Sequence, residues 1–189
     1  MMKKQFAFGL LAAALTAGAH AETYKLDPNH TKVLFAIGHF GTSTNHGGFY
    51  SIEGELQLDA AKETGQLSLE IPVASVQTGI AAFDDHLKSA DLFNVEKYPV
   101  MTYTSTAWTF KDGQPETVTG DLTLLGKTNP VTLTAEQFNC YESPMFDGAT
   151  VCGGDFSATL DRTQWGMDYI VGPIPAEVQL SIQVEGIKQ

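Results

Sequence analysis

The stretch EVQLSIQVEG, residues 177–186, alternates apolar and polar side chains almost without a break. Val178, Leu180, Ile182 and Val184 fall on one face, and glutamine, serine and glutamate occupy the positions between them. A period of two is typical of a β-strand that buries one face and exposes the other. The stretch therefore predicts a half-buried strand.

The same alternation recurs along most of the chain. It is present in 33–40, 54–59, 65–73, 100–108 and 154–162, and 121–138 shows two strands around a turn at Gly126–Pro130. About eight strands joined mostly by short turns indicate an all-β fold, either an antiparallel sandwich or a barrel. Because no strand–helix–strand alternation is present, a doubly wound nucleotide-binding fold is excluded.

The N-terminal segment has the pattern of an export signal. Lys3 and Lys4 precede an apolar run from Phe6 to Leu15, and Ala19-His20-Ala21 matches a signal peptidase site. The apolar run is too short to span a bilayer. We therefore expect residues 1–21 to be a signal peptide cleaved after Ala21, and residues 22–189 to be one periplasmic domain with no transmembrane segment.

The chain is acidic, with a formal net charge of −11 at pH 7. Such a charge disfavours nucleic acid and anionic membrane surfaces as partners, because both are negatively charged. The two cysteines, Cys140 and Cys152, follow an export signal and flank a stretch containing Pro, Asp and Gly. We expect a disulfide that closes a hairpin, since neither a C-x-x-C spacing nor a nearby histidine supports a redox or metal pair.

One segment departs from the alternation. Between Gly79 and Lys88, Ile80, Phe83 and Leu87 recur at helical spacing, and a second short turn carries Leu92 and Phe93. A single helical segment, at about 79–94, in an all-strand chain is expected to cover an open end of a barrel, and this segment is here called the lid. In this interpretation Ile80, Phe83, Leu87 and Phe93 face inward, and Asp85 and Lys88 face water.

The polar residues of this segment could in principle form a catalytic or metal site. Asp84 and Asp85 are adjacent, so on a helix their carboxylates diverge and would not flank one substrate bond. No nucleophile or oxyanion hole is marked, so we predict no catalytic residues. His30, His39, His46 and His86 have no metal-ligand spacing, so we predict no metal and no cofactor. The favoured interpretation is that Asp84 caps a turn or pairs with a base, while His86 forms a hydrogen bond within the lid.

Several motifs occur in the order found in one known family. They are YKLDPNHTKVLFAIGHFG (24–41), SVQTG (75–79), DDHLKSADLF (84–93), YPVMTYTS (98–105), VTGDLTLLGKTNPVTL (118–133) and DRTQWGM (161–167). Over nearly all of residues 22–189 the chain resembles the YceI-like family of exported, lipocalin-like polyisoprenoid-binding proteins. Phe83 replaces the arginine usual in that family, Leu92 replaces a frequent phenylalanine, and the cysteine pair is not part of the general pattern.

The resemblance implies an extended eight-stranded antiparallel barrel that holds a polyisoprenoid or another long-chain amphiphilic lipid. The residues expected to contact the ligand are Phe35, Ile37, His39, Phe49, Leu67, Leu69, Phe83, His86, Leu87, Phe93, Met101, Tyr103, Phe156, Arg162 and Trp165. Leu56, Leu160 and Val184 also lie on the strand faces predicted to point inward. Taken without the resemblance, parity favours a filled core over a cavity wall.

Three functions follow as hypotheses. The first is a non-enzymatic carrier of the lipid; the others are an enzyme acting on such a lipid and an interaction protein with a filled core. A homodimer is left open. Arg162 continues the inward parity of its strand, so we expect it at the mouth of the interior, paired with Asp84 or a ligand pyrophosphate. The alternative for Arg162 is an exposed position at the end of the strand.

Overall fold

The structure is a computed structural model that describes residues 21–189; the predicted signal peptide therefore lies outside the described residues except for Ala21. The strands are β1 (Glu22–Leu26), β2 (Lys32–His39), β3 (Ser43–Phe49), β4 (Glu53–Asp59), β5 (Thr64–Pro72), β6 (Val76–Gln77), β7 (Val100–Lys111), β8 (Gln114–Leu124), β9 (Lys127–Glu142), β10 (Thr150–Asp161) and β11 (Glu177–Lys188). The helical elements are η1 (Val73–Ser75), α1 (Ala81–Lys88) and η2 (Arg162–Trp165).

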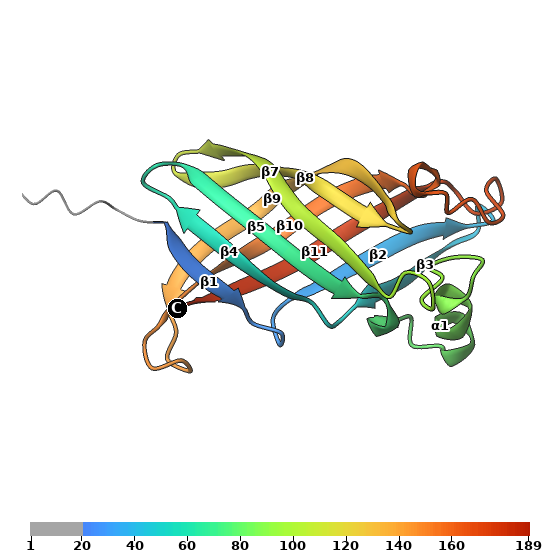
Figure 1. Cartoon of the computed structure of the whole chain (residues 1–189), viewed down its shortest axis with the longest axis horizontal. Helices are drawn as coiled ribbons and strands as arrows, with labels where there is room; N and C mark the ends of the chain where they lie inside the picture. Colours follow the sequence, from blue (N-terminus) through green and yellow to red (C-terminus); the bar gives the residue numbers. More distant parts are fainter. Residues whose placement is uncertain (1–20) are drawn as a thin grey trace, which may run out of the picture.

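Eight strands close an elongated antiparallel barrel (Figure 1). The sheet order runs β1-β4-β5-β7-β8-β9-β10-β11, and β1 pairs with β11 to complete the ring. The predicted all-β, eight-stranded barrel is confirmed. Closure leaves no free strand edge in the ring and directs every second side chain to the interior.

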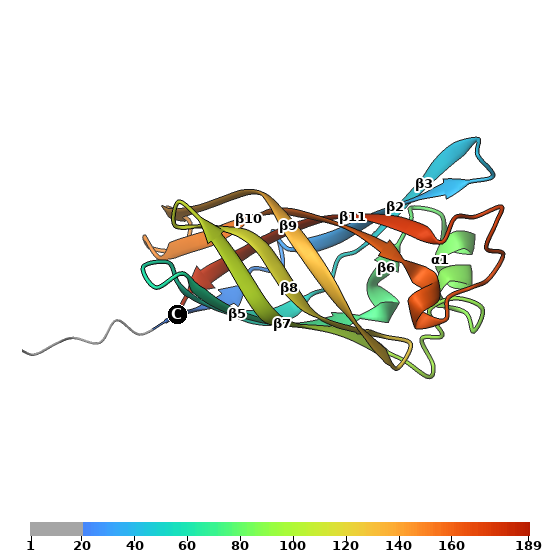
Figure 2. The same ribbon diagram turned by 90° about the horizontal axis from the view of Figure 1, so that it is seen from above.

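The strand of the opening motif, β11, holds the ring together. It pairs with β10 from Asp161↔Glu177 to Val151↔Ile187 on one edge. Its other edge is shared, because β1 pairs with 186–188 and β2 pairs with 179–183. From β2 the sheet continues to β3 and β6, and the β2–β3 hairpin projects at the end of the barrel that carries α1 (Figure 2).

A short turn between β1 and β2 is fastened to β11. Asp27 N donates to the carbonyl of Glu185 at 2.8 Å, and the Thr31 hydroxyl donates to the same carbonyl at 3.3 Å. The buried Asp27 carboxylate also lies 2.6 Å from His30 Nδ1 and accepts from Asn29 N at 2.9 Å. This turn lets two successive strands share one edge of β11.

The hairpin between β8 and β9 is tighter than the sequence predicted. The turn is formed by Leu125 and Gly126 alone, with φ values of 51° and 72°, as in the type I′ turns that suit twisted hairpins. Pro130 belongs to β9 and lies opposite Asp121, so the predicted Gly126–Pro130 turn is wrong in its extent. Proline is accommodated there because β9 pairs with β10 only from Thr134 onward.

The predicted disulfide is confirmed. Cys140 and Cys152 lie directly opposite each other on β9 and β10 and are bonded, with their Cα atoms 4.1 Å apart. The cross-link closes the hairpin loop between the two strands. By chain-entropy reasoning a loop this short contributes about 3 kcal/mol to stability.

The predicted helical segment is confirmed in part. The helix α1 covers Ala81–Lys88, and the chain continues through turns to Tyr98. Ile80 occupies the N-cap position and is 52% exposed, so the prediction that it faces inward is wrong. The reason is that the chain is still extended at Ile80, which therefore does not share the helical face of Leu87. Among residues 21–189, no helix has the length and apolar character that crossing a bilayer requires.

The Asp27–His30 pair makes stability depend on pH. The hydrogen bond to Asp27 raises the pKa of His30 above its ordinary value of 6.5. A group whose pKa is higher in the folded state stabilises the fold below its unfolded pKa, and this contribution is lost as pH rises through the folded pKa. We therefore expect the urea midpoint to fall as pH increases above about 6.5, and His30→Gln to remove this part of the dependence.

His46→Gln is the matched control, because no carboxylate of the described residues lies within ion-pair distance of His46, so the slope should persist. For Asp27, burial alone would raise the pKa, but hydrogen bonds from His30 and Asn29 outweigh it and lower the pKa. The stability that Asp27 contributes is present above pH about 4 and is lost as pH falls through its lowered pKa.

If the slope of stability against pH above 6.5 were the same in His30→Gln as in the wild type, His30 would not be the group responsible.

Candidate functional site

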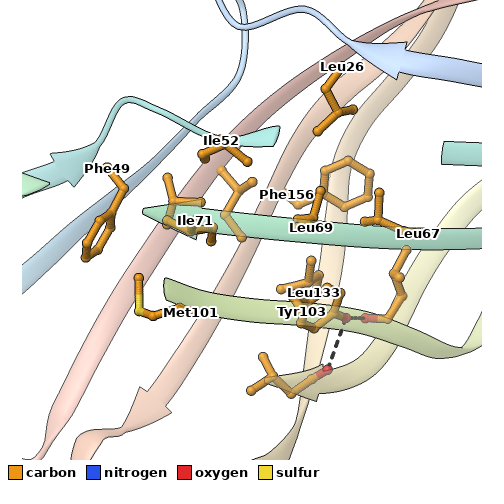
Figure 3. Close-up of a cluster of buried hydrophobic side chains, with 14 of the residues drawn as sticks. Leu26, Phe49, Ile52, Leu67, Leu69, Ile71, Met101, Tyr103, Leu133 and Phe156 are labelled. Carbon is orange, nitrogen blue, oxygen red and sulfur yellow. Dashed lines mark hydrogen bonds between the residues drawn. The ribbon is translucent and has the colours of Figure 1, made fainter. Parts of the chain in front are cut away.

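A cavity of about 330 Å³ occupies one end of the barrel interior. Its walls come from β2, β3, β5, β7, β8, β9, β10 and β11, and its mouth is bordered by α1 and by the segment 162–176. The lining is almost entirely apolar. Figure 3 shows part of this wall, where Ile71 and Met101 lie opposite each other on the neighbouring strands β5 and β7, and Phe49 comes from β3. The volume is at the lower end of the range for pockets that bind small organic ligands, about 300–1,000 Å³.

The structure brings most of the predicted ligand-contacting residues together in this main cavity. Those that line it are Phe35, Ile37, His39, Phe49, Leu69, Phe83, His86, Leu87, Phe93, Met101, Tyr103, Arg162 and Trp165. Leu67 and Phe156 instead line a second, inner cavity of about 40 Å³. Both have the expected inward parity, but they lie further along the barrel.

Other lining residues were not predicted from the sequence to contact the ligand. On the strands they include Leu122, Leu124, Val131, Leu133, Leu180 and Ile182, all of which lie in stretches of two-residue alternation. That alternation was the signal that could have identified them. Met167, Tyr169, Ile170 and Ile174 come from the segment after η2, which has no periodic pattern. Only the folded chain brings this segment over the mouth.

Tyr103 forms part of the cavity wall with its polar group satisfied. Its hydroxyl donates to the carbonyl of Val118 at 2.9 Å and lies 3.3 Å from that of Val131 (Figure 3). Gly120 makes room for the ring, because a Cβ at this position would lie 2.5 Å from Tyr103 Cζ. Burial raises the pKa of Tyr103, so the side chain stays neutral. The cavity therefore gains an apolar ring surface here.

Arg162, the single arginine in the sequence, has partners other than those expected. It is only 5% exposed, which excludes the exposed strand-end alternative. Nε donates to the carbonyl of Pro175 at 2.9 Å, and the terminal nitrogens donate to those of Met167 at 2.8 Å, Tyr169 at 3.1 Å and Ile174 at 3.2 Å. Arg162 thus holds the segment 166–176, here called the mouth loop, against the barrel.

The expected pairing of Arg162 with Asp84 is wrong. Among the described residues, no carboxylate lies within ion-pair distance of Arg162. Asp84 Oδ1 instead accepts from the backbone N–H and the hydroxyl of Thr78, both at 2.7 Å. The hydrogen bond from the Thr78 hydroxyl lowers the pKa of Asp84. Asp84 therefore fastens the turn before α1, as the capping interpretation predicted.

Three segments meet at the mouth. The His86 ring on α1 packs edge-on against Tyr169 of the mouth loop, with ring centroids 5.2 Å apart, and His86 Nε2 lies 3.7 Å from Asp91 Oδ2. Phe40, at the tip of the β2–β3 hairpin, donates its N–H to the carbonyl of Pro173 at 2.9 Å. Among the described residues, this 3.7 Å approach to Asp91 is the polar contact of His86 within the lid, and it is too long to be the predicted hydrogen bond. Contacts of the mouth loop with α1 and with the tip of the β2–β3 hairpin therefore border the mouth.

Groups typical of metal centres do not converge here. In the described range, residues 21–189, no three His, Cys, Asp or Glu side chains are placed to hold a metal ion. Asp85 is exposed and does not line the main cavity, while Asp84 is occupied by Thr78. The arrangement is suited to enclosing an apolar molecule.

Comparison with known proteins identifies the family. The model of the YceI-like domain matches residues 24–186. The chain belongs to the YceI-like family. This YceI-like protein is 38% identical to Protein YceI of Escherichia coli O157:H7 and 37% identical to a UPF0312 protein of Pseudomonas aeruginosa, in both cases over the full length of both chains.

Solved structures share the fold of this YceI-like protein. Burkholderia cenocepacia BcnA superposes with a TM-score of 0.68 at 25% identity, covering 85% of this chain and 98% of that one. A polyisoprenoid binding domain from Saccharophagus degradans superposes with a TM-score of 0.64 at 16% identity, covering 90% and 100%. The lipocalin-like barrel expected from the sequence is therefore confirmed.

Replacing Arg162 should release the mouth loop. Lysine cannot reach four carbonyls at once, because its ammonium is a compact charge on a flexible stem. We expect Arg162→Lys to leave buried carbonyls unpaired, to lower stability by on the order of 3 kcal/mol, and to speed amide hydrogen exchange in 166–176. The amides of Leu180–Val184 serve as the internal reference. Wild-type exchange rates in the mouth loop of the variant would contradict this role.

Proposed function

We propose that this protein binds a polyisoprenoid or a similar long-chain amphiphilic lipid in the main cavity and carries it through the periplasm. The observation that carries the proposal is a cavity of about 330 Å³ walled by apolar side chains inside a closed barrel. A slender apolar chain fits such a space, and the polar groups at the mouth, His39, Asn45 and His86, lie where a head group would meet water.

A binding cavity accounts for the interior better than a filled core does. Protein interiors normally contain few voids larger than a water molecule. A water molecule in this space would find few hydrogen-bond partners, because the Tyr103 hydroxyl and the Trp165 indole N–H already donate to backbone carbonyls. Apolar cavities of this kind stay dry and bind apolar molecules.

The polar residues at the mouth favour binding over catalysis. Arg162 donates to backbone carbonyls, Asp84 accepts from Thr78, and His86 packs on Tyr169. Each side chain is engaged in holding a segment of the mouth in place. An enzyme would need a nucleophile or an acid–base pair directed at a reacting atom. We therefore propose a carrier and not an enzyme.

Two further features support an exported lipid carrier. The predicted signal peptide and the Cys140–Cys152 disulfide both fit an oxidising compartment such as the periplasm. The Saccharophagus degradans domain with the same fold is described as polyisoprenoid binding. In an aqueous compartment, a long-chain lipid must be shielded from water to move between membranes.

Filling the cavity should displace the lipid. Met101 lines the main cavity and is 5% exposed, so Met101→Trp adds bulk where the ligand would lie. Overpacking costs about 1–3 kcal/mol, which corresponds to an affinity lower by roughly fivefold to more than a hundredfold. The test is organic extraction of natively purified protein, followed by mass spectrometry of the lipid recovered per mole of protein.

Met145→Trp is the matched control. Met145 is 73% exposed on the β9–β10 loop and lines neither cavity, so occupancy should stay at the wild-type level. Equal lipid recovery from both variants would reject the cavity as the binding site. Recovery of no lipid from the wild type would reject the carrier function.

The lid should control exchange of the ligand. None of the residues of α1 is fully buried, and a short helix with little burial opens at low cost compared with global unfolding. Phe83 lines the cavity although it is 46% exposed. We expect Phe83→Ala to speed lipid release several-fold with little dependence on salt, as measured by transfer of a fluorescent fatty alcohol to acceptor vesicles.

Ile80→Ala is the control for the lid, because Ile80 is exposed to a similar extent but does not line the cavity. Its release rate should match that of the wild type. Amides of α1 should also exchange with solvent before those of Leu180–Val184. Equal protection in the two segments would show a fixed plug, and the lipid would then have to enter by another route.

A further inference from the structure

The main and inner cavities are separated by a narrow set of side chains. Four of them line both cavities: Val33, Leu69, Leu133 and Ile182, here called the collar. We propose that the collar acts as a ruler that sets the longest lipid chain the barrel can enclose. This inference rests on the proposed function and adds a structural basis for selecting lipids by chain length.

The collar is built into the closed part of the sheet. Its residues come from β2, β5, β9 and β11, and all four are buried. Val33 and Ile182 are direct cross-strand partners, and Leu69 is the partner of Tyr103. Each of these strands is held by ladder hydrogen bonds to its neighbours. The collar therefore cannot widen by moving one loop, as the mouth can.

The space beyond the collar is too small for more of the chain. The inner cavity measures about 40 Å³, against about 330 Å³ on the mouth side. A cavity measured in this way needs about 10–15 Å³ to hold one water molecule, so the inner space holds only a few atoms. Phe156, Phe138 and Cys152 line it, and the disulfide ties Cys152 to the neighbouring strand.

A ruler follows from these two volumes. Each methylene group buried on the mouth side should strengthen binding by about fourfold. Once the chain end reaches the collar, further carbons have to remain outside the mouth, in water, and add little. Affinity should therefore rise with chain length and then level off at a length that the collar defines.

The test uses prenyl alcohols as probes: geraniol, farnesol, geranylgeraniol and solanesol, which differ in the number of isoprene units. Delipidated full-length mature protein is titrated with each probe. Leu133→Ala opens the collar and should move the plateau to longer chains. Val33→Phe narrows it and should move the plateau to shorter chains, so a folding defect in one variant leaves the other as a test.

Leu58→Ala is the matched control, because Leu58 is as buried as Leu133 but lines neither cavity. It should keep the wild-type plateau even though it loses the same number of carbons. Opposite shifts in the two collar variants support the ruler. Superimposable length profiles in wild type, Leu133→Ala and Val33→Phe overturn it while leaving lipid binding intact. Failure of every probe to bind the wild type overturns the proposed function itself.

Discussion

Pairing along both edges of β11 is the constraint on which the rest of the structure depends. One edge is taken by β10 over nearly the whole strand, and the other is divided between β1 and β2. This division requires the chain to turn sharply between the two, and the turn is fastened by Asp27 and Thr31 to Glu185. With the ring closed, inward side chains can meet only across the interior. They leave a main cavity at the end where the connections are longest.

The cavity is costly for a domain of this size. When it is empty, the apolar lining of the cavity lacks the van der Waals contacts that a filled core would give it, which lowers the stability of the fold. The ladder hydrogen bonds and the Cys140–Cys152 disulfide hold the walls apart against collapse. A ligand that fills the space recovers part of this cost, so binding and stability are coupled.

The sequence could predict which face of each strand points inward, but not how far along the barrel each side chain lies. Alternation in 177–186 correctly indicated a strand with an inward face, and the family motifs indicated the barrel. Leu67 and Phe156 lie on the inward faces of their strands, as predicted, but beyond the collar. The alternation of residues shows which face a side chain is on, not its position along the barrel axis. The partners of Arg162 could not be predicted either. They are backbone carbonyls of a loop without periodicity. Every residue has a backbone carbonyl, so the residue types do not show which ones Arg162 contacts.

The central claim is that a lipid chain occupies the main cavity. The most direct test is a crystal structure of the mature protein purified without detergent from cells that export it. We expect continuous elongated density that runs from the mouth, between α1 and the mouth loop, past Met101 and ends at the collar. Side chains collapsed into the space, or a cavity filled only by ordered water, would contradict it.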